Sequence, residues 1–178
     1  DVIRRLPELL PHESPRLILH CGDFGIWPGT AGERFLHKVN RELLAVNGAI
    51  FFVDGNHDAT PVLERFAQQD GMGRAADRIW HLPRGHRWQW HDRTWAAVGG
   101  GVSLDRAARA EGRNWWPGEE ISDEQEKLII AGGPVDVMVS HDRPSSVIHT
   151  FPDRPSWWDQ TDVDRSERHE ERLQRIAD

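Results

Sequence analysis

Three short apolar runs are each followed by a residue type that binds metal ions, and this pattern limits the possible folds more than any other feature. The runs at 17–21, 49–53 and 135–139 are followed by Asp23, Asn56 and His141. Runs of this length and composition are typical of buried strands. In open α/β sheets, binding sites lie at the carboxyl ends of the strands. The pattern therefore predicts an α/β fold with a metal site where three strands end.

The composition narrows the class of partner. The 178 residues carry 22 basic and 29 acidic side chains, a formal net charge of -7, which argues against nucleic-acid binding by bulk charge. The single cysteine, Cys21, excludes an internal disulfide and suits a reducing compartment. No apolar stretch approaches the roughly 20 residues that a membrane span needs. We therefore expect a cytoplasmic protein without a membrane partner.

The periodicity predicts alternating strands and helices in the first part of the chain. Apolar residues at helical spacing between 35 and 46 predict a helix, which Thr30 and Glu33 would begin as a capping box. With the runs on either side, this helix predicts a parallel strand–helix–strand crossover. A further short helix should begin at Pro61 and carry Phe66.

The second part is less regular. Aromatic-rich runs at 79–82, 88–90 and 94–98 predict an antiparallel hairpin in a second sheet. The long 99–121 segment lacks a clear period, which is typical of a functional or disordered loop. Ser122 should begin a short helix that ends near Ile130. Helical patterns are also predicted at both ends of the chain, at 1–10 and 161–178.

The residue types at the strand ends suggest a reaction. A carboxylate, an amide oxygen and an imidazole, from Asp23, Asn56 and His141, suit borderline divalent ions such as Mn²⁺, Fe²⁺ or Zn²⁺. Two such ions about 3.5–4 Å apart can activate a hydroxide and hold a phosphoryl group for in-line attack. His57 could then give a proton to the leaving oxygen, and Asp58 could orient its imidazole.

Gly22-Asp23, Gly55-Asn56-His57-Asp58 and His141 resemble, in order and in placement after strands, the motifs of the calcineurin-like metallophosphoesterases. The resemblance implies a two-layer β-sandwich flanked by helices, in αββα order. It implies that Asp23 bridges two metal ions and that Asn56 and His141 bind the second. It also implies that His57 is the catalytic histidine, oriented by Asp58. The substrate would be a small-molecule or nucleotide phosphate ester.

The family pattern also includes an Asp-x-His motif before these blocks and a Gly-His-x-His motif after them. Neither lies within residues 1–178 in the expected place, and both ends of the chain fall in helical patterns. We therefore expect one domain, incomplete at both termini, without its first and last core strands. The intact protein should hold two divalent ions (Mn, Fe, Zn or Ni, with Mn favoured). The 178-residue chain itself should bind metal weakly and have little or no activity.

The role of the 99–121 segment stays open. Its part from Ser103 to Glu119 resembles an insert of some small bacterial family members. Arg109 within it could bind a substrate phosphate as a bidentate donor or lie in solvent. Two other hypotheses also stand: a non-catalytic binding or scaffold protein that keeps the fold, and an unrelated α/β domain.

Overall fold

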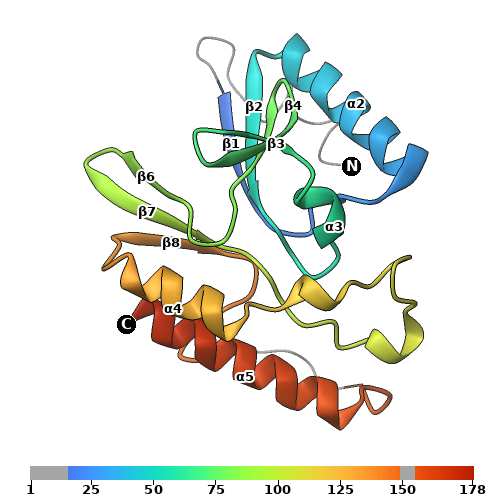
Figure 1. The fold of residues 1–178 in the computed structure, drawn as a ribbon, viewed down its shortest axis with the longest axis vertical. Helices are drawn as coiled ribbons and strands as arrows, with labels where there is room; N and C mark the ends of the chain where they lie inside the picture. Colours follow the sequence, from blue (N-terminus) through green and yellow to red (C-terminus); the bar gives the residue numbers. More distant parts are fainter. Residues whose placement is uncertain (1–15, 149–154) are drawn as a thin grey trace.

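The computed structural model describes residues 16–148 and 155–178, which form two β-sheets packed face to face with helices outside them (Figure 1). The layers run α2, first sheet, second sheet, then α4 with α5. This αββα arrangement confirms the predicted fold class. The elements, in chain order, are β1 (Arg16–Cys21), α2 (Gly29–Ala45), β2 (Gly48–Val53), α3 (Thr60–Leu63), β3 (Ala67–Gln69), β4 (Met72–Ala76), β5 (Ile79–His81), β6 (Arg87–Trp90), β7 (Arg93–Val98), η1 (Arg106–Ala108), η2 (Pro117–Glu119), α4 (Asp123–Ala131), β8 (Val137–Ser140) and α5 (Gln160–Ala177).

The first sheet has the strand order β1-β2-β5-β4-β3. β1, β2 and β5 are parallel, and their register pairs Cys21 with Val53, so the carboxyl ends of β1 and β2 lie level. The predicted strands at 16–21 and 49–53 are confirmed as β1 and β2. β1 was expected to be buried, but it is an edge strand with Leu17 and Cys21 exposed. The short helix predicted through Phe66 ends at Leu63 instead, and the chain continues into the β3–β4 hairpin.

The second sheet has the order β6-β7-β8. β6 and β7 form the predicted hairpin, whose turn places His91 and Asp92 at positive φ. The 79–82 run was wrongly assigned to it: β5 pairs in parallel with β2 in the first sheet. A strand of three residues carries too little pattern to reveal its partner. β8 is parallel to β7, and so it also ends at the edge where the site lies.

Helix starts were predicted with mixed success. α4 begins with the expected capping box, in which Ser122 and Gln125 each accept from the other's backbone N–H. α2 begins instead after Pro28, without a side-chain cap, so the capping box of Thr30 and Glu33 is wrong. The 161–178 helix is confirmed as α5. The helix predicted at 1–10 lies outside the described residues. Within the described ranges, no helix is both long and apolar enough to cross a membrane.

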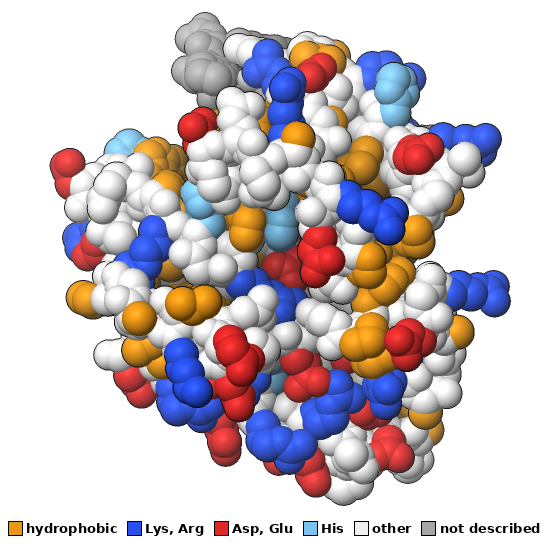
Figure 2. Space-filling model, viewed as in Figure 1, with side chains coloured by type: hydrophobic (Ala, Val, Ile, Leu, Met, Phe, Trp, Pro, Cys, Tyr) orange, Lys and Arg blue, Asp and Glu red, His pale blue; other side chains and the backbone are white. Residues whose placement is uncertain are grey.

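Helix α5 is attached to its neighbours by arginines. Arg165 pairs with Glu120, and both Arg172 and Arg175 pair with Glu126 of α4. The lower part of Figure 2, where these helices lie, accordingly shows basic and acidic side chains next to each other. On the inner side of these helices, a small buried core is formed by Val98, Ile121, Ile129 and Leu173.

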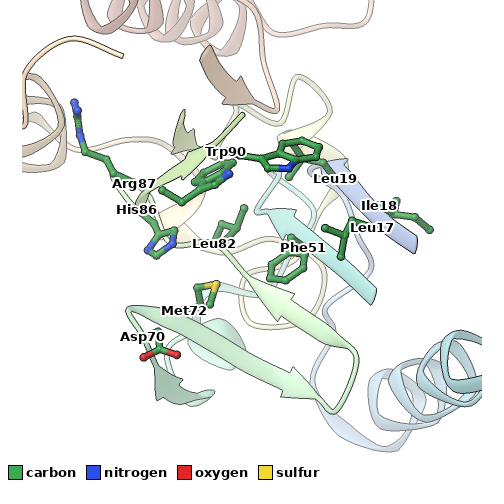
Figure 3. A pocket seen from close by; sticks show the side chains of 11 residues that line it. Leu17, Ile18, Leu19, Phe51, Asp70, Met72, Leu82, His86, Arg87 and Trp90 are labelled. Carbon is green, nitrogen blue, oxygen red and sulfur yellow. The ribbon is translucent and has the colours of Figure 1, made fainter. Parts of the chain in front are cut away.

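The space between the sheets is apolar. Val53, Leu82, Ala97 and Val139 form its buried part. At one side this space opens into a cavity of about 400 Å³, lined mostly by apolar and aromatic side chains (Figure 3). Asp70, His86 and Arg87 are its ionisable lining residues. None of the predicted metal-binding or catalytic residues lines this cavity.

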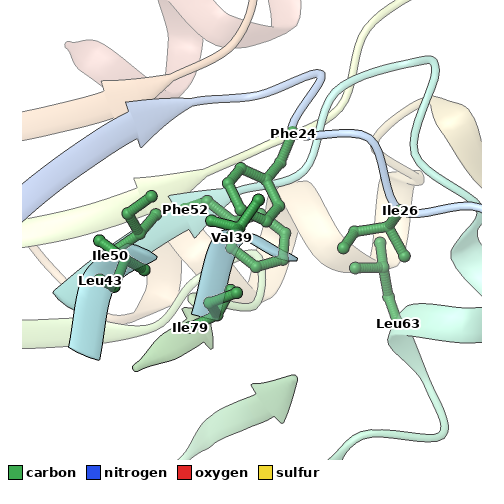
Figure 4. Close-up of a cluster of buried hydrophobic side chains, with 8 residues drawn as sticks. All are labelled: Phe24, Ile26, Val39, Leu43, Ile50, Phe52, Leu63 and Ile79. Atoms are coloured by element: carbon green, nitrogen blue, oxygen red, sulfur yellow. The ribbon is translucent and has the colours of Figure 1, made fainter. Parts of the chain in front are cut away.

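The largest cluster lies between α2 and the first sheet (Figure 4). Val39 and Leu43 of α2 pack there with Ile50 and Phe52 of β2. Phe51 and Val53, the alternate residues of β2, face the second sheet instead. β2 therefore has apolar contacts on both faces, which explains why its sequence is a continuous apolar run.

Candidate functional site

The three predicted metal-binding residues follow β1, β2 and β8, and the structure brings their side chains together. His141 Nε2 lies 3.0 Å from Asn56 Oδ1 and 3.6 Å from Asp23 Oδ1. These residues are far apart in the chain and meet only because their strands end at a common edge. The geometry therefore places one carboxylate oxygen and one amide oxygen within 3.6 Å of the same imidazole nitrogen.

The protonation of His141 bears on whether these atoms fit a cation. His141 Nδ1 lies 2.8 Å from the carbonyl oxygen of Cys21, which can only accept, so Nδ1 carries the hydrogen. Nε2 then faces the two oxygens, and it offers a lone pair to a metal ion when it carries no hydrogen. Three electron-rich atoms at this spacing repel one another unless a proton or a cation lies between them. The donor set therefore fits a divalent ion.

The site depends on an amide as well as on ionisable groups. In the part of the chain that the structure describes, no group of three or more His, Cys, Asp or Glu side chains could hold a metal ion. Asp23 and His141 contribute two such residues here, and Asn56 supplies the third donor. Asn56 Nδ2 donates to Ser103 Oγ at 3.0 Å, which leaves its oxygen facing His141.

His57 lies beside this cluster. Its backbone N–H donates to Asp23 Oδ1 at 3.0 Å, and its Nδ1 lies 3.5 Å from Asp23 Oδ2. Arg109 Nη2 lies 2.7 Å from His57 Nε2. Because a guanidinium only donates, Nε2 is the acceptor, and Nδ1 carries the hydrogen that faces Asp23.

Arg109 is itself held in place, so it does not lie free in solvent. It donates through Nε and Nη2 to the two carboxylate oxygens of Asp105, at 2.6 and 2.7 Å, and through Nη1 to the carbonyl of Asn114. The hydrogen bond to Asp105 raises the pKa of Arg109, and the same bond lowers the pKa of Asp105. The guanidinium is therefore a fixed positive charge next to His57.

Asp58 has a different position from the one predicted. Its carboxylate is fully buried and accepts the backbone N–H groups of Phe24, Gly25, Ile26 and Gly55, at 2.8–3.1 Å. None of the hydrogen bonds between described residues joins it to the His57 imidazole, which we expected it to orient. Asp58 instead ties the loop after β1 to the loop after β2.

The two glycines of the motifs allow the close approach of these loops. A Cβ atom on Gly22 would lie 2.3 Å from His141 Nδ1, and one on Gly55 would lie 2.3 Å from Asp23 Oδ1. Gly22 also has a φ of 93°, which other residues rarely adopt. Both positions therefore require glycine if Asp23 and His141 are to keep their places.

Comparison with known families agrees with this geometry. The family model described as calcineurin-like phosphoesterase matches residues 1–172. The chain belongs to the calcineurin-like phosphoesterase family. No curated protein and no solved structure gives a match.

Calcineurin-like phosphoesterases are, in general, metal-dependent hydrolases of phosphoesters, and they generally bind two divalent metal ions. The chain thus belongs to a family with hydrolase activity toward phosphoesters. The individual roles of Asp23, Asn56, His57, His141 and Arg109 stay predictions.

The sequence analysis missed a buried ion pair beside the motif. Asp54 precedes Gly55 and lies 2.6 Å from Arg84 and 3.4 Å from His81. Burial alone would raise the pKa of Asp54, but Arg84 and the hydrogen bond with His81 together hold it well below its usual range. A lone aspartate after a strand gives no local signal of a partner thirty residues away.

It also missed Ser103 and Glu119, which connect the 99–121 segment to Asn56. Ser103 Oγ donates to Glu119 Oε2 at 2.5 Å and accepts from Asn56. Neither residue belongs to a periodic pattern. Their place in the long irregular segment is the only sequence feature that could have indicated them.

Proposed function

We propose that the intact protein hydrolyses a small-molecule or nucleotide phosphate ester with the help of divalent metal ions. The observation that carries the proposal is the convergence of Asp23 Oδ1, Asn56 Oδ1 and His141 Nε2 beside His57. Family membership over residues 1–172 supports the same reaction.

Asp23, Asn56 and His141 would hold the metal. Mn²⁺ is the ion that we propose first, with Fe²⁺, Zn²⁺ and Ni²⁺ as alternatives, because mixed oxygen and imidazole donors suit such borderline ions. When bound, these ions supply positive charge that activates water and neutralises phosphoryl oxygens. Asp23 also positions His57, because its carboxylate accepts the backbone N–H of His57 and lies close to the His57 ring.

His57 and Arg109 would bind the phosphoryl group. The Asp105 carboxylate holds the Arg109 guanidinium in one orientation, and a fixed guanidinium suits bidentate binding of phosphate oxygens. In this structure His57 Nε2 accepts from Arg109. When a phosphate ester takes the Arg109 donors, Nε2 becomes free to take up a proton from solvent, and the resulting imidazolium can give that proton to the leaving oxygen.

The decisive experiment removes the central carboxylate. In the full-length protein, Asp23→Ala should lower Mn²⁺-dependent hydrolysis of an aryl phosphate diester or monoester by at least about 100-fold, because it takes away a ligand and the partner of His57. Asp77→Ala is a matched control, since Asp77 is exposed and pairs with Arg74 away from the site.

Near-normal activity of Asp23→Ala would contradict the proposal. If the unaltered protein bound Mn²⁺ but hydrolysed no ester in a broad panel, the scaffold hypothesis would be favoured instead. Arg109→Ala provides a second measurement: it should raise KM more than it lowers kcat if the guanidinium mainly binds the phosphate.

A further inference from the structure

We propose that Glu119 and Ser103 are positioning residues that determine which end of the Asn56 amide faces the metal. This inference rests on the proposed function, because it takes Asn56 as a metal ligand. It concerns residues of the 99–121 segment and makes that segment a part of the metal site.

A side-chain amide has two ends of nearly equal size, and only one of them binds a cation. The oxygen has lone pairs for a metal ion, whereas the NH₂ group carries two hydrogens and repels it. Rotation of the Asn56 amide by half a turn would exchange the two ends. Shape alone therefore does not select the binding orientation, and a hydrogen-bond partner has to do so.

A chain of hydrogen bonds that starts at Glu119 selects the orientation of the Asn56 amide. The Glu119 carboxylate accepts from the backbone N–H of Ser103 at 3.2 Å and from Ser103 Oγ at 2.5 Å. A serine hydroxyl has one hydrogen, which this second bond uses. Ser103 Oγ can therefore only accept from Asn56, at 3.0 Å, and it selects the NH₂ end.

Both the backbone carbonyl and the carboxylate of Glu119 are held in place by neighbouring residues. Its carbonyl accepts from Arg84 Nη2 at 2.9 Å and from the N–H of Gly101 at 3.0 Å. Arg165 of α5 lies 3.5 Å from its carboxylate and offsets part of the buried charge. A carboxylate held in this way is a rigid end point for the hydrogen-bond chain.

The first test is the affinity of the full-length protein for Mn²⁺, measured by calorimetry. Ser103→Ala removes the acceptor for the Asn56 NH₂ group. Glu119→Gln places an NH₂ group against Ser103 Oγ, which turns the hydroxyl hydrogen toward Asn56 and favours the reversed amide. Each substitution should weaken Mn²⁺ binding by about 10–100-fold, the usual effect of losing the partner of a metal ligand.

Asn56→Asp separates positioning from general damage. A carboxylate presents an oxygen in either orientation, so it does not need Ser103 to select one. In that background, Ser103→Ala should change Mn²⁺ affinity by no more than about twofold. Equal losses in the two backgrounds would overturn the inference and leave the proposed function standing.

Two further variants serve as controls. Glu120→Gln makes the same chemical change one residue along the chain, at a carboxylate that pairs with Arg165, and should leave Mn²⁺ affinity within about twofold. Ser103→Thr keeps the hydroxyl and should retain most of the affinity. Thermal unfolding shows which variants are folded, and Glu119→Gln carries the test if Ser103→Ala is not.

A measurement without metal distinguishes the two proposals. In the metal-free protein, the side-chain amide hydrogens of Asn56 should exchange with solvent faster after Ser103→Ala, as followed by NMR. Unchanged exchange would overturn this inference alone. Failure of the unaltered full-length protein to bind Mn²⁺ would overturn the proposed function.

Discussion

Among the individual residues, Asp58 shows most clearly how one side chain can organise a site through the backbone, without a hydrogen bond to the His57 imidazole. Its two oxygens satisfy four backbone N–H groups, three of them at consecutive residues after β1. Buried N–H groups are costly when unpaired, and hydrogen bonds to a charged acceptor are the stronger kind. Asp58 therefore fixes the loop on which Asp23 lies.

Asp58→Asn should destabilise the protein by about 3 kcal/mol, because an amide has one acceptor oxygen and turns an NH₂ group toward backbone donors. Urea unfolding at neutral pH would measure the loss. Asp77→Asn, at an exposed position, should change the free energy of unfolding by less than about 0.5 kcal/mol. A loss below about 1 kcal/mol for Asp58→Asn would indicate that its carboxylate is not structural.

Between elements, Arg84 is the main connection of the 99–121 segment to the first sheet. Its side chain is only 7% exposed and pairs with Asp54, which follows β2. It also donates to the carbonyls of Gly118, Glu119 and Glu120. One buried guanidinium thus joins the carboxyl end of β2 to the segment that carries Glu119.

Arg84→Met should lower the free energy of unfolding by about 3–5 kcal/mol, because it leaves the Asp54 charge buried without its partner. Chemical denaturation would measure this loss. Arg93→Met is the matched control: Arg93 is 64% exposed and pairs with Asp136, so its loss should cost no more than about 1 kcal/mol. Similar losses in the two variants would contradict the role assigned to Arg84.

For the molecule as a whole, a buried and a half-buried histidine should make stability depend on pH. Burial lowers the pKa of His169 on α5 and that of His86 beside β6. In the unfolded chain, both histidines regain a pKa near the ordinary value of about 6.5. Below that pH the unfolded state binds more protons than the folded state, so the free energy of unfolding falls with falling pH.

We therefore expect the protein to be less stable at pH 5.5 than at pH 7.5. His169→Gln removes one of these titrating groups and should make the decline shallower. Urea unfolding of both proteins at the two pH values would test this expectation. An equally steep decline in the variant would show that His169 does not contribute.

The sequence by itself determined several of the elements and where ligand residues follow three of the strands. The apolar runs of β1 and β2, the capping box of α4 and the helical period of α5 are local signals, and each was interpreted correctly. The Gly-Asn-His-Asp motif likewise identified the family before any geometry was known. Such features can be predicted from the sequence because they depend on residues close together in the chain.

Only the tertiary structure decided which side chains meet. In the structure, Asp58 accepts from backbone N–H groups instead of contacting the His57 imidazole, and Arg109 donates to His57. Ser103 connects Glu119 to Asn56 by hydrogen bonds. These partners lie far apart in the chain or in segments without a period. Their pairing follows from how two sheets pack at a common edge, and no local pattern of residues records that packing.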